Sequence, residues 1–185
     1  MLQTAEKWAI DFSHSKIGFS VKHFGISETE GLFKNASGNI TTGTNDFSDA
    51  EVEIEIDPNS INTFDEQRDT HLRSADFLET EKYPHILFKS TYVERVSGNN
   101  FKLHGDLTIK AVTKPVAFDM EFIGRVARDP FGNTKAGLLL QGKINSKDFG
   151  LTWNIALDHG GLAVSDTVKI HCPVELNKIQ DANLN

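Results

Sequence analysis

Cysteine and long hydrophobic runs are both scarce in this sequence of 185 residues, which has a single cysteine, Cys172. A lone cysteine excludes disulfide bonds within the chain, and it excludes zinc sites and redox motifs built from paired cysteines. The longest apolar runs are about four residues, whereas a membrane-spanning helix needs roughly 20. We therefore expect a protein held together by its core, without stable membrane insertion.

Positive charge is also in short supply. The chain has 19 Lys and Arg residues against 26 Asp and Glu residues, for a formal net charge of −7. Binding to a nucleic-acid backbone needs clustered lysines and arginines, and the lysines here are scattered among acidic residues. The composition argues against nucleic acid as the main partner and favours a small molecule or another protein.

The first residues do not have the features of an export signal. Residues 1–7 contain neither a basic stretch nor the apolar run of roughly 7–15 residues that a signal peptide carries. We therefore predict a cytoplasmic protein, and a periplasmic one if an export signal has been removed. Residues 1–7 are predicted as a lead-in, 8–178 as one domain and 179–185 as a polar tail.

Apolar and polar residues alternate with a period of two over most of the chain. In residues 50–57 each apolar residue alternates with an acidic one, which is the pattern of a half-buried β-strand. Turn sequences such as those at 43–46 and 158–161 separate the strands. Eight or nine strands are predicted, because the alternation recurs in further segments: 8–12, 17–23, 32–40, 86–93, 101–110, 116–122, 136–144 and 168–176.

Strands of this number, each with one apolar face, can close into a barrel or stack as a sandwich. Their length and their short connections favour an all-β fold, an eight-stranded antiparallel up-and-down β-barrel. Glu51, Glu53, Glu55, Lys102 and Lys169 should then point to solvent. The apolar residues of the alternation should share one interior: Val52, Ile54, Ile56, Phe101, Leu103, Leu107, Phe118, Phe122, Leu138, Leu140, Ile170 and Val174.

Residues 60–83 break the alternation, and a short helical insertion is predicted at about 61–80. Thr63 and Glu66 have the spacing of a capping box that opens a helix. Asp69 and Arg73 are four residues apart and are expected to form an ion pair. Spacings of three or four residues place one group of side chains on the opposite helix face: Phe64, Arg68, His71, Leu72 and Ala75.

An eight-stranded barrel is either filled by its own side chains or holds one small ligand. The 13 phenylalanines supply large apolar side chains without polar groups, and both alternatives can use them. Glycines on or beside the inward faces, Gly18, Gly105 and Gly142, favour space inside the barrel.

Residues able to do chemistry are few. The seven histidines have no metal-ligand spacing, and no nucleotide-binding or hydrolase motif is present, so neither a metal nor a cofactor is expected. His23 extends the inward set of residues 17–23, where it is either bonded within the core or a polar contact at the mouth of a cavity. Arg68 either grips an oxygen of a ligand or forms a structural ion pair.

Several motifs along the chain resemble those of one known family. The first is Trp8-x-Ile10-Asp11-x-x-His14-Ser15-x-Ile17-x-Phe19-x-Val21-Lys22-His23, followed by Gly31-x-Phe33. The others come later in the same order: Ser60-Ile61-x-Thr63, Arg68-Asp69-x-His71-Leu72-x-Ser74-x-Asp76-Phe77, Tyr83-Pro84-x-Ile86-x-Phe88-x-Ser90, Gly105-x-Leu107-Thr108, Val112-Thr113-Lys114-Pro115 and Asp148-Phe149-Gly150. Spread over residues 8–177, they make the chain similar to the YceI-like family.

The resemblance implies an extended, lipocalin-like barrel that the helical insertion closes at one end. It also implies binding of a long apolar chain, such as a polyisoprenoid, an isoprenoid quinone or a fatty-acid-like lipid, with export to the periplasm and homodimers among family members. The side chains then expected to bind the ligand are Phe19, Val21, His23, Phe33, Phe64, Arg68, His71, Leu72, Phe77, Phe88, Phe101, Leu103, Leu107, Phe118, Leu138 and Leu140.

The function predicted from these features is binding, storage or transport of a long apolar amphiphile, without catalysis. One alternative is an enzyme that acts on an isoprenoid or quinone in the same barrel, which requires a second polar group facing His23. The other alternative is a stress-related interaction protein whose barrel is filled by its own side chains.

Overall fold

The computed structural model describes residues 5–158 and 160–180. Residues 1–4 of the predicted lead-in and 181–185 of the predicted tail lie outside this part of the chain. Within it, no helix is both long enough and apolar enough to cross a membrane. The elements are β1 (Glu6–Ile10), β2 (Ile17–His23), β3 (Ser27–Phe33), β4 (Ala36–Thr42), β5 (Glu51–Ile56), β6 (Ile61–Asn62), α1 (Glu66–Arg73), β7 (Ile86–Ser97), β8 (Asn100–Ile109), β9 (Val112–Val126), β10 (Lys135–Asn145) and β11 (Val164–Lys178), with 3-10 helices at Pro58–Ser60 and Ser146–Phe149.

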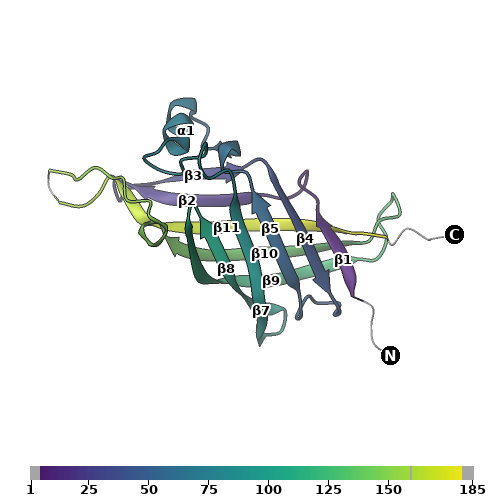
Figure 1. Cartoon of the computed structure of the whole chain (residues 1–185). Helices are drawn as coiled ribbons and strands as arrows, with labels where there is room; N and C mark the ends of the chain where they lie inside the picture. Colours follow the sequence, from purple (N-terminus) through teal and green to yellow (C-terminus); the bar gives the residue numbers. More distant parts are fainter. Residues whose placement is uncertain (1–4, 159, 181–185) are drawn as a thin grey trace.

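Eight strands close the barrel, and their arrangement can be followed in Figure 1. Hydrogen-bonded neighbours follow the order β1, β4, β5, β7, β8, β9, β10 and β11, and β11 pairs with β1 to complete the ring. Every one of these pairings is antiparallel. The predicted all-β fold with one short helix is therefore confirmed.

The strands β2, β3 and β6 continue three members of this ring. Residues 176–178 of β11 pair with β1 and residues 164–171 pair with β2, so β1 and β2 lie end to end along one neighbour. β3 continues β4, and β6 continues β5, in the same manner. Each broken pair counts as one long strand, and the chain then runs up and down in sequence order, as predicted.

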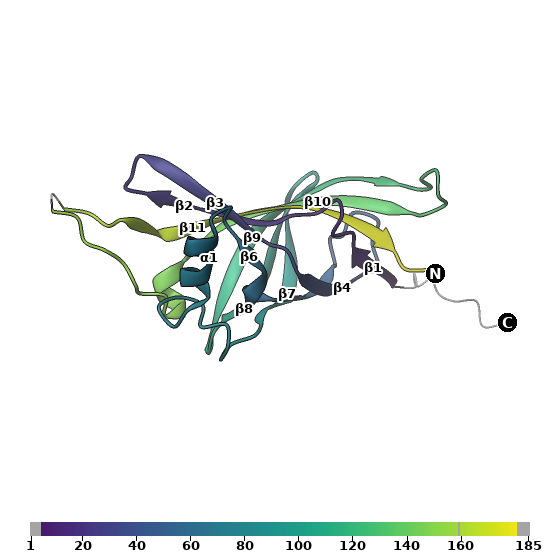
Figure 2. The same ribbon diagram turned by 90° about the horizontal axis from the view of Figure 1, so that it is seen from above.

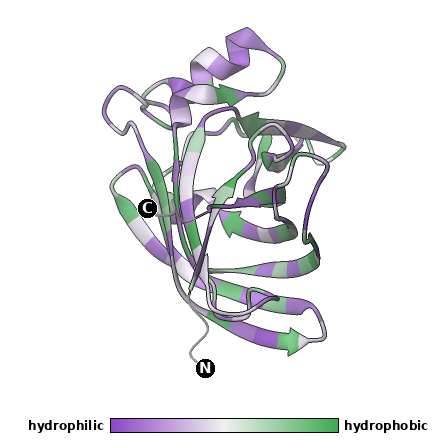
Figure 3. Ribbon diagram, turned by 90° about the vertical axis from the view of Figure 1, so that its right-hand side faces the viewer, coloured by the Kyte–Doolittle hydropathy of each residue, from purple (hydrophilic) through white to green (hydrophobic). Residues whose placement is uncertain are grey.

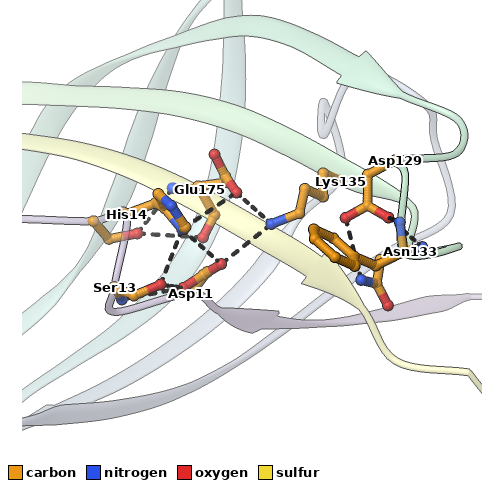
Figure 4. Close-up of polar contacts among 9 residues, drawn as sticks. Asp11, Ser13, His14, Asp129, Asn133, Lys135 and Glu175 are labelled. Atoms are coloured by element: carbon orange, nitrogen blue, oxygen red, sulfur yellow. Dashed lines mark hydrogen bonds and ion pairs between the residues drawn. The ribbon is translucent and has the colours of Figure 1, made fainter.

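A polar cluster holds the break between β1 and β2 (Figure 4). Asp11 accepts hydrogen bonds from the hydroxyl and the backbone N–H of Ser13, and these bonds, with those from His14 and Lys135, hold the pKa of its carboxyl well below the usual range. The Lys135 ammonium also bonds to Glu175 of β11 at 2.5 Å. Ligand atoms of Asp11, His14 and Glu175 lie within 4.8 Å of one another, and the Lys135 ammonium pairs with both carboxylates. The cluster fastens the first strand to the last.

Apolar and polar residues alternate along the strands, as the coloured bands of Figure 3 show. The three glutamates of β5 are exposed, whereas Val52 between them is buried. Lys102 pairs with Asp119 and Lys169 with Glu28 on the outer face. Every residue predicted to face the interior belongs to the core or packs against it, so the register of the prediction is confirmed.

Side chains fill one end of the barrel, which we call the barrel floor. Trp8, Phe47, Phe101 and Leu176 are at most 1% exposed. The ring centroids of Trp8 and Phe47 lie 5.2 Å apart, and those of Phe47 and Phe122 lie 5.9 Å apart. Aromatic rings at these distances gain energy beyond the apolar area they bury, so the floor is a tightly packed core.

The floor carries a charge pair that makes its stability depend on pH. Arg95 stacks over the Phe101 ring at 4.7 Å and bonds to Asp46 at 2.5 Å. That hydrogen bond lowers the pKa of Asp46 from 3.8 to about 2. Because the folded pKa is depressed, the stabilisation is present above pH 3.8 and is lost as the pH falls through about 2.

We expect Arg95→Met to remove this pH-dependent contribution. The free energy of unfolding of the wild type should fall more steeply between pH 4 and 2 than that of the variant. Urea unfolding monitored by circular dichroism at several pH values measures the two slopes. Parallel curves would show that Asp46 draws its stability from another donor.

Candidate ligand-binding cavity

The interior is hollow beyond the barrel floor. The cavity has a volume of about 910 Å³, near the upper end of the range typical of small-molecule pockets. Each of the eight barrel strands contributes inward-facing side chains to its wall, and α1 and residues 151–166 line the end that we call the mouth. Figure 1 shows α1 and this segment at the same end of the barrel.

Most side chains that the sequence predicted as ligand-binding line this cavity. They come from β2, β3, the helical insertion, β7, β8, β9 and β10, which are distant in sequence and meet because the barrel is closed. The residues on the cavity wall are Phe19, Val21, His23, Phe33, Arg68, His71, Leu72, Phe77, Phe88, Leu103, Leu107, Phe118, Leu138 and Leu140. Phe64 and Phe101 are not among them.

Phe101 belongs to the barrel floor. It is 1% exposed and lies opposite Met120 in the ladder between β8 and β9. Leu103, two residues further along β8, does reach the cavity. The alternation placed Phe101 correctly on the inner face, but it cannot say where along the barrel axis the packing ends and the cavity begins.

Phe64 was predicted on a helix face and is instead 76% exposed, before the helix begins. The N-cap is Asp65, whose side chain accepts a hydrogen bond from the backbone N–H of Arg68. The N-cap therefore lies two residues after Thr63, and the predicted capping box of Thr63 and Glu66 is not formed. Helix α1 ends at Arg73, so Ala75 is not on its face either.

Asp69 is buried, whereas the sequence predicted it on the polar side of the helix in an ion pair with Arg73. Its carboxylate accepts hydrogen bonds from the backbone N–H of Thr63 at 2.8 Å and from the Thr63 hydroxyl at 2.6 Å. Arg73 pairs with Glu66 at 3.3 Å instead. Asp69 thus ties α1 to the chain that leaves β6, because it satisfies a backbone donor that is buried beside it.

Arg68 shares this anchor. Its Nε donates to the Thr63 hydroxyl at 2.8 Å and its Nη2 donates to the Thr63 carbonyl at 2.7 Å. Its Nη1 lies 3.9 Å from Oδ2 of Asp65, which is the ion-pair partner of Arg68 in the described part of the chain. Most of the guanidinium is therefore engaged in holding the insertion over the cavity.

The mouth is packed with aromatic rings. The His71 ring lies edge-on to two other rings, with centroid distances of 4.7 Å to Trp153 and 5.1 Å to Phe77. The centroids of the Trp153 and Phe77 rings are 5.1 Å apart. His71 Nε2 also lies 2.8 Å from a carboxylate oxygen of Asp76. These contacts join α1 to residues 151–166 across the mouth.

His23 stands at the mouth, at the end of β2. Its Cα pairs with Val164 at the end of β2, and its ring lies 3.8 Å from that of Phe24. Within residues 5–158 and 160–180, no side-chain hydrogen bond to His23 is formed. Asn154 instead bonds to the backbone of Val164 at 2.7 Å, so the imidazole nitrogens of His23 are available to a ligand.

The segment 151–166 supplies mouth residues that the sequence reading missed, among them Trp153, Asn154 and Ile155. It contains little regular structure, so neither a period of two nor a helical spacing marked it. The signal that could have found it is indirect. Phe149 of the family motif is buried, and the next residue, Gly150, has a left-handed backbone (φ 76°). Together these two residues fix where the segment starts.

The glycines predicted to leave space inside the barrel have another role. A Cβ atom on Gly105 would lie 2.5 Å from the Phe88 ring, and one on Gly142 would lie 2.6 Å from the Phe118 ring. A Cβ on Gly18 would lie 2.7 Å from a backbone oxygen. The absence of a side chain at these glycines lets rings and backbone approach the strands closely. Gly18 also lines the cavity, whereas Gly105 and Gly142 do not.

The wall below the mouth offers an apolar surface. Cys172 lines it, and burial raises the pKa of its thiol to about 11, so the thiol stays protonated and is a poor nucleophile. In the part of the chain that the structure describes, the charged lining residues are Asp65, Arg68 and Asp166, all at the mouth. Asp166 is paired with Lys147 at 2.7 Å. The cavity can therefore hold an apolar chain with a polar group at one end.

Comparison with known proteins identifies the family. A family model described as the YceI-like domain matches residues 8–176. The chain belongs to the YceI-like family. A UPF0312 protein of Staphylococcus aureus (strain N315) is 36% identical over 171 residues, which cover 92% of this chain and 96% of that protein. The resemblance that the sequence motifs indicated is thereby confirmed.

Solved structures share the fold of this YceI-like chain. The YCEI protein of Campylobacter jejuni is 30% identical with a TM-score of 0.69, over 92% of this chain and 96% of its own. BcnA of Burkholderia cenocepacia has a TM-score of 0.76 at 20% identity, over 90% and 98%. A polyisoprenoid binding domain of Saccharophagus degradans has a TM-score of 0.71 at 17% identity, over 93% and 98%. The two more distant structures show the fold alone.

Proposed function

We propose that this YceI-like protein binds and carries a long apolar amphiphile, such as a polyisoprenoid, an isoprenoid quinone or a fatty-acid-like lipid, within the barrel. The observation that carries the proposal is a cavity of about 910 Å³ whose wall is apolar and whose polar side chains lie at one end. The polyisoprenoid binding domain with the same fold supports this ligand class. Burying one CH₂ group gains about 0.8 kcal/mol, so a C15 chain gains on the order of 10 kcal/mol before the costs of binding.

The cavity favours binding over the two alternative functions. A filled barrel does not fit an empty interior of this volume. An enzyme of the kind considered would need a second polar group poised against His23, and among the described residues no side chain forms a hydrogen bond to the His23 ring. We therefore assign the polar groups to ligand orientation and to anchoring of α1.

The test of the function is mass spectrometry of an organic extract of the purified protein. We expect one class of long-chain lipid in near-stoichiometric amount, and none in an extract of protein unfolded and washed before extraction. A protein that contains no lipid, and that takes up neither farnesol nor palmitate after purification, would contradict the proposal.

We expect His23, and not Arg68, to read the polar end of the ligand. Apolar contacts are non-directional, so the orientation of the chain depends on the few polar groups at the mouth. His23→Leu should weaken binding of farnesol about tenfold, the loss of one hydrogen bond, and should leave binding of a C15 hydrocarbon nearly unchanged.

Arg68→Ala provides the contrast in the same titrations. Because Arg68 already donates to Thr63, its loss should loosen α1 and weaken both probes by a similar factor. A larger loss for farnesol than for the hydrocarbon with Arg68→Ala would reverse the two roles.

The two tryptophans provide the readout for these titrations. Trp153 lies at the mouth and Trp8 in the floor, so the Trp153 fluorescence reports binding at the polar end.

A further inference from the structure

Exposed apolar side chains gather at the cavity mouth. They are Phe24, Ile26, Ile155 and Leu162, with exposed fractions of 46, 87, 53 and 37%. We call these four residues the mouth rim. They come from the turn between β2 and β3 and from residues 151–166, which Figure 2 shows side by side at one end of the molecule.

Backbone hydrogen bonds join the two parts of the mouth rim. Phe24 N–H donates to the Ala163 carbonyl and Ala163 N–H donates to the Ile155 carbonyl, both at 2.9 Å. Ala156 and Leu162 form a β-bridge within the second segment. Phe24 and Ile155 also line the cavity. The apolar lining therefore continues without interruption onto the outer surface.

The turn at Phe24 is a costly place for an aromatic residue. Phe24 and Gly25 have φ values of 51° and 71°, and Ile26 N–H donates to the His23 carbonyl at 3.1 Å. Two positive φ values with this bond are the mark of a type I′ turn, whose first position favours Asn or Asp. Phe47 and Phe64 also have positive φ values, so the backbone conformation alone assigns no function to Phe24. It holds the Phe24 side chain 46% exposed at the mouth.

The charges beside the mouth rim narrow the choice of partner. Residues 21–30 and 151–166 contain one basic residue, Lys22, and four acidic residues: Glu28, Glu30, Asp158 and Asp166. Two lysines of neighbouring elements lie beside them and are paired, Lys169 with Glu28 and Lys147 with Asp166. Anionic lipids recruit proteins through clustered Lys and Arg, and no such cluster is present in these segments. The apolar interior of a lipid layer without net charge can accommodate apolar side chains that project from two loop tips.

We propose that the mouth rim docks transiently on the surface of a bilayer of zwitterionic lipid and passes the ligand between bilayer and cavity. The inference rests on the proposed function, because a long apolar chain that left the bilayer elsewhere would expose each CH₂ group to water. Four apolar side chains insert shallowly, as in interfacial anchors. The contact is reversible and requires no membrane-spanning segment.

The test is flotation of the purified protein with vesicles of phosphatidylcholine alone. The double variant Ile26→Ser/Leu162→Ser removes apolar rim side chains that do not line the cavity. Its partitioning onto the vesicles should fall about 30-fold or more, from two lost apolar side chains, while its affinity for farnesol in solution stays at the wild-type value. The matched control is Phe131→Ser, because Phe131 is also 87% exposed but lies in the β9–β10 hairpin at the opposite end of the barrel (Figure 2).

The outcomes separate this proposal from the proposed function. Wild-type protein that does not float with the vesicles, or a loss with Phe131→Ser equal to that of the double variant, would overturn docking by the mouth rim. Flotation that requires phosphatidylglycerol would overturn the choice of a zwitterionic surface, and a dimer in solution that Ile26→Ser abolishes would assign the rim to a second copy of the chain. Failure to bind farnesol, with vesicle flotation intact, would contradict the cavity function alone.

Discussion

Leu140→Phe is expected to weaken binding of farnesol by about 30- to 100-fold while the protein stays folded. Leu140 lies on the cavity wall, opposite Met120 of β9 and Cys172 of β11. A phenyl ring at this position projects into the cavity and displaces about three CH₂ groups of a bound chain, each worth about 0.8 kcal/mol. The added ring enters empty space, so the overpacking penalty of a filled core does not apply.

Leu139→Phe is the matched control for this change. Leu139 is the next residue on the same strand, faces the other side of the sheet and does not line the cavity. The same substitution there should leave farnesol affinity within about twofold of the wild type, because adjacent residues of a strand point to opposite faces. Titrations of lipid-free protein, with circular dichroism to verify folding, give both affinities. An equal loss for the two variants would mean that the ligand does not occupy the barrel.

The sequence was most informative where one physical rule acts alone. The alternation of glutamates with Val52, Ile54 and Ile56 places every side chain of β5, since a half-buried strand has a strict period of two. The same rule gave the inward faces of β8, β9, β10 and β11, and with them most of the cavity wall. The family motifs reinforced this reading through residues that the alternation leaves unexplained, such as Asp11 and His14 at the break between β1 and β2.

Features that depend on tertiary packing could not be predicted from the sequence. Phe101 and Leu103 have the same parity and similar chemistry, yet one fills the floor and the other lines the cavity. Their roles differ because Phe47, from a loop, packs into the floor. The helix start was misplaced because both Thr63 and Asp65 can cap a helix. The burial of Asp69 was invisible since its partner is the same Thr63, and local spacing suggested Arg73.

The division of the barrel into floor and cavity predicts that stability and binding can be changed separately. Phe101→Ala should lower the free energy of unfolding by about 3–5 kcal/mol, the typical cost of removing a buried ring. Phe101 is 1% exposed and its ring also supports the Arg95 guanidinium, so neighbouring atoms cannot close the void without losing other contacts. Phe101→Leu should cost about 1 kcal/mol and provides a milder variant if the alanine variant does not fold.

Phe88→Ala is the counterpart on the cavity wall. The Phe88 ring packs against Phe118 at 5.7 Å and against Gly105, but one side of it faces the cavity. A ring with empty space on one side has fewer contacts to lose, so the change should cost about 2 kcal/mol, less than Phe101→Ala. Farnesol affinity should fall for Phe88→Ala and remain at the wild-type value for folded Phe101→Leu. Urea unfolding and ligand titration of the same preparations measure both quantities. A loss of affinity in Phe101→Leu as large as that in Phe88→Ala would show that the ligand reaches the floor.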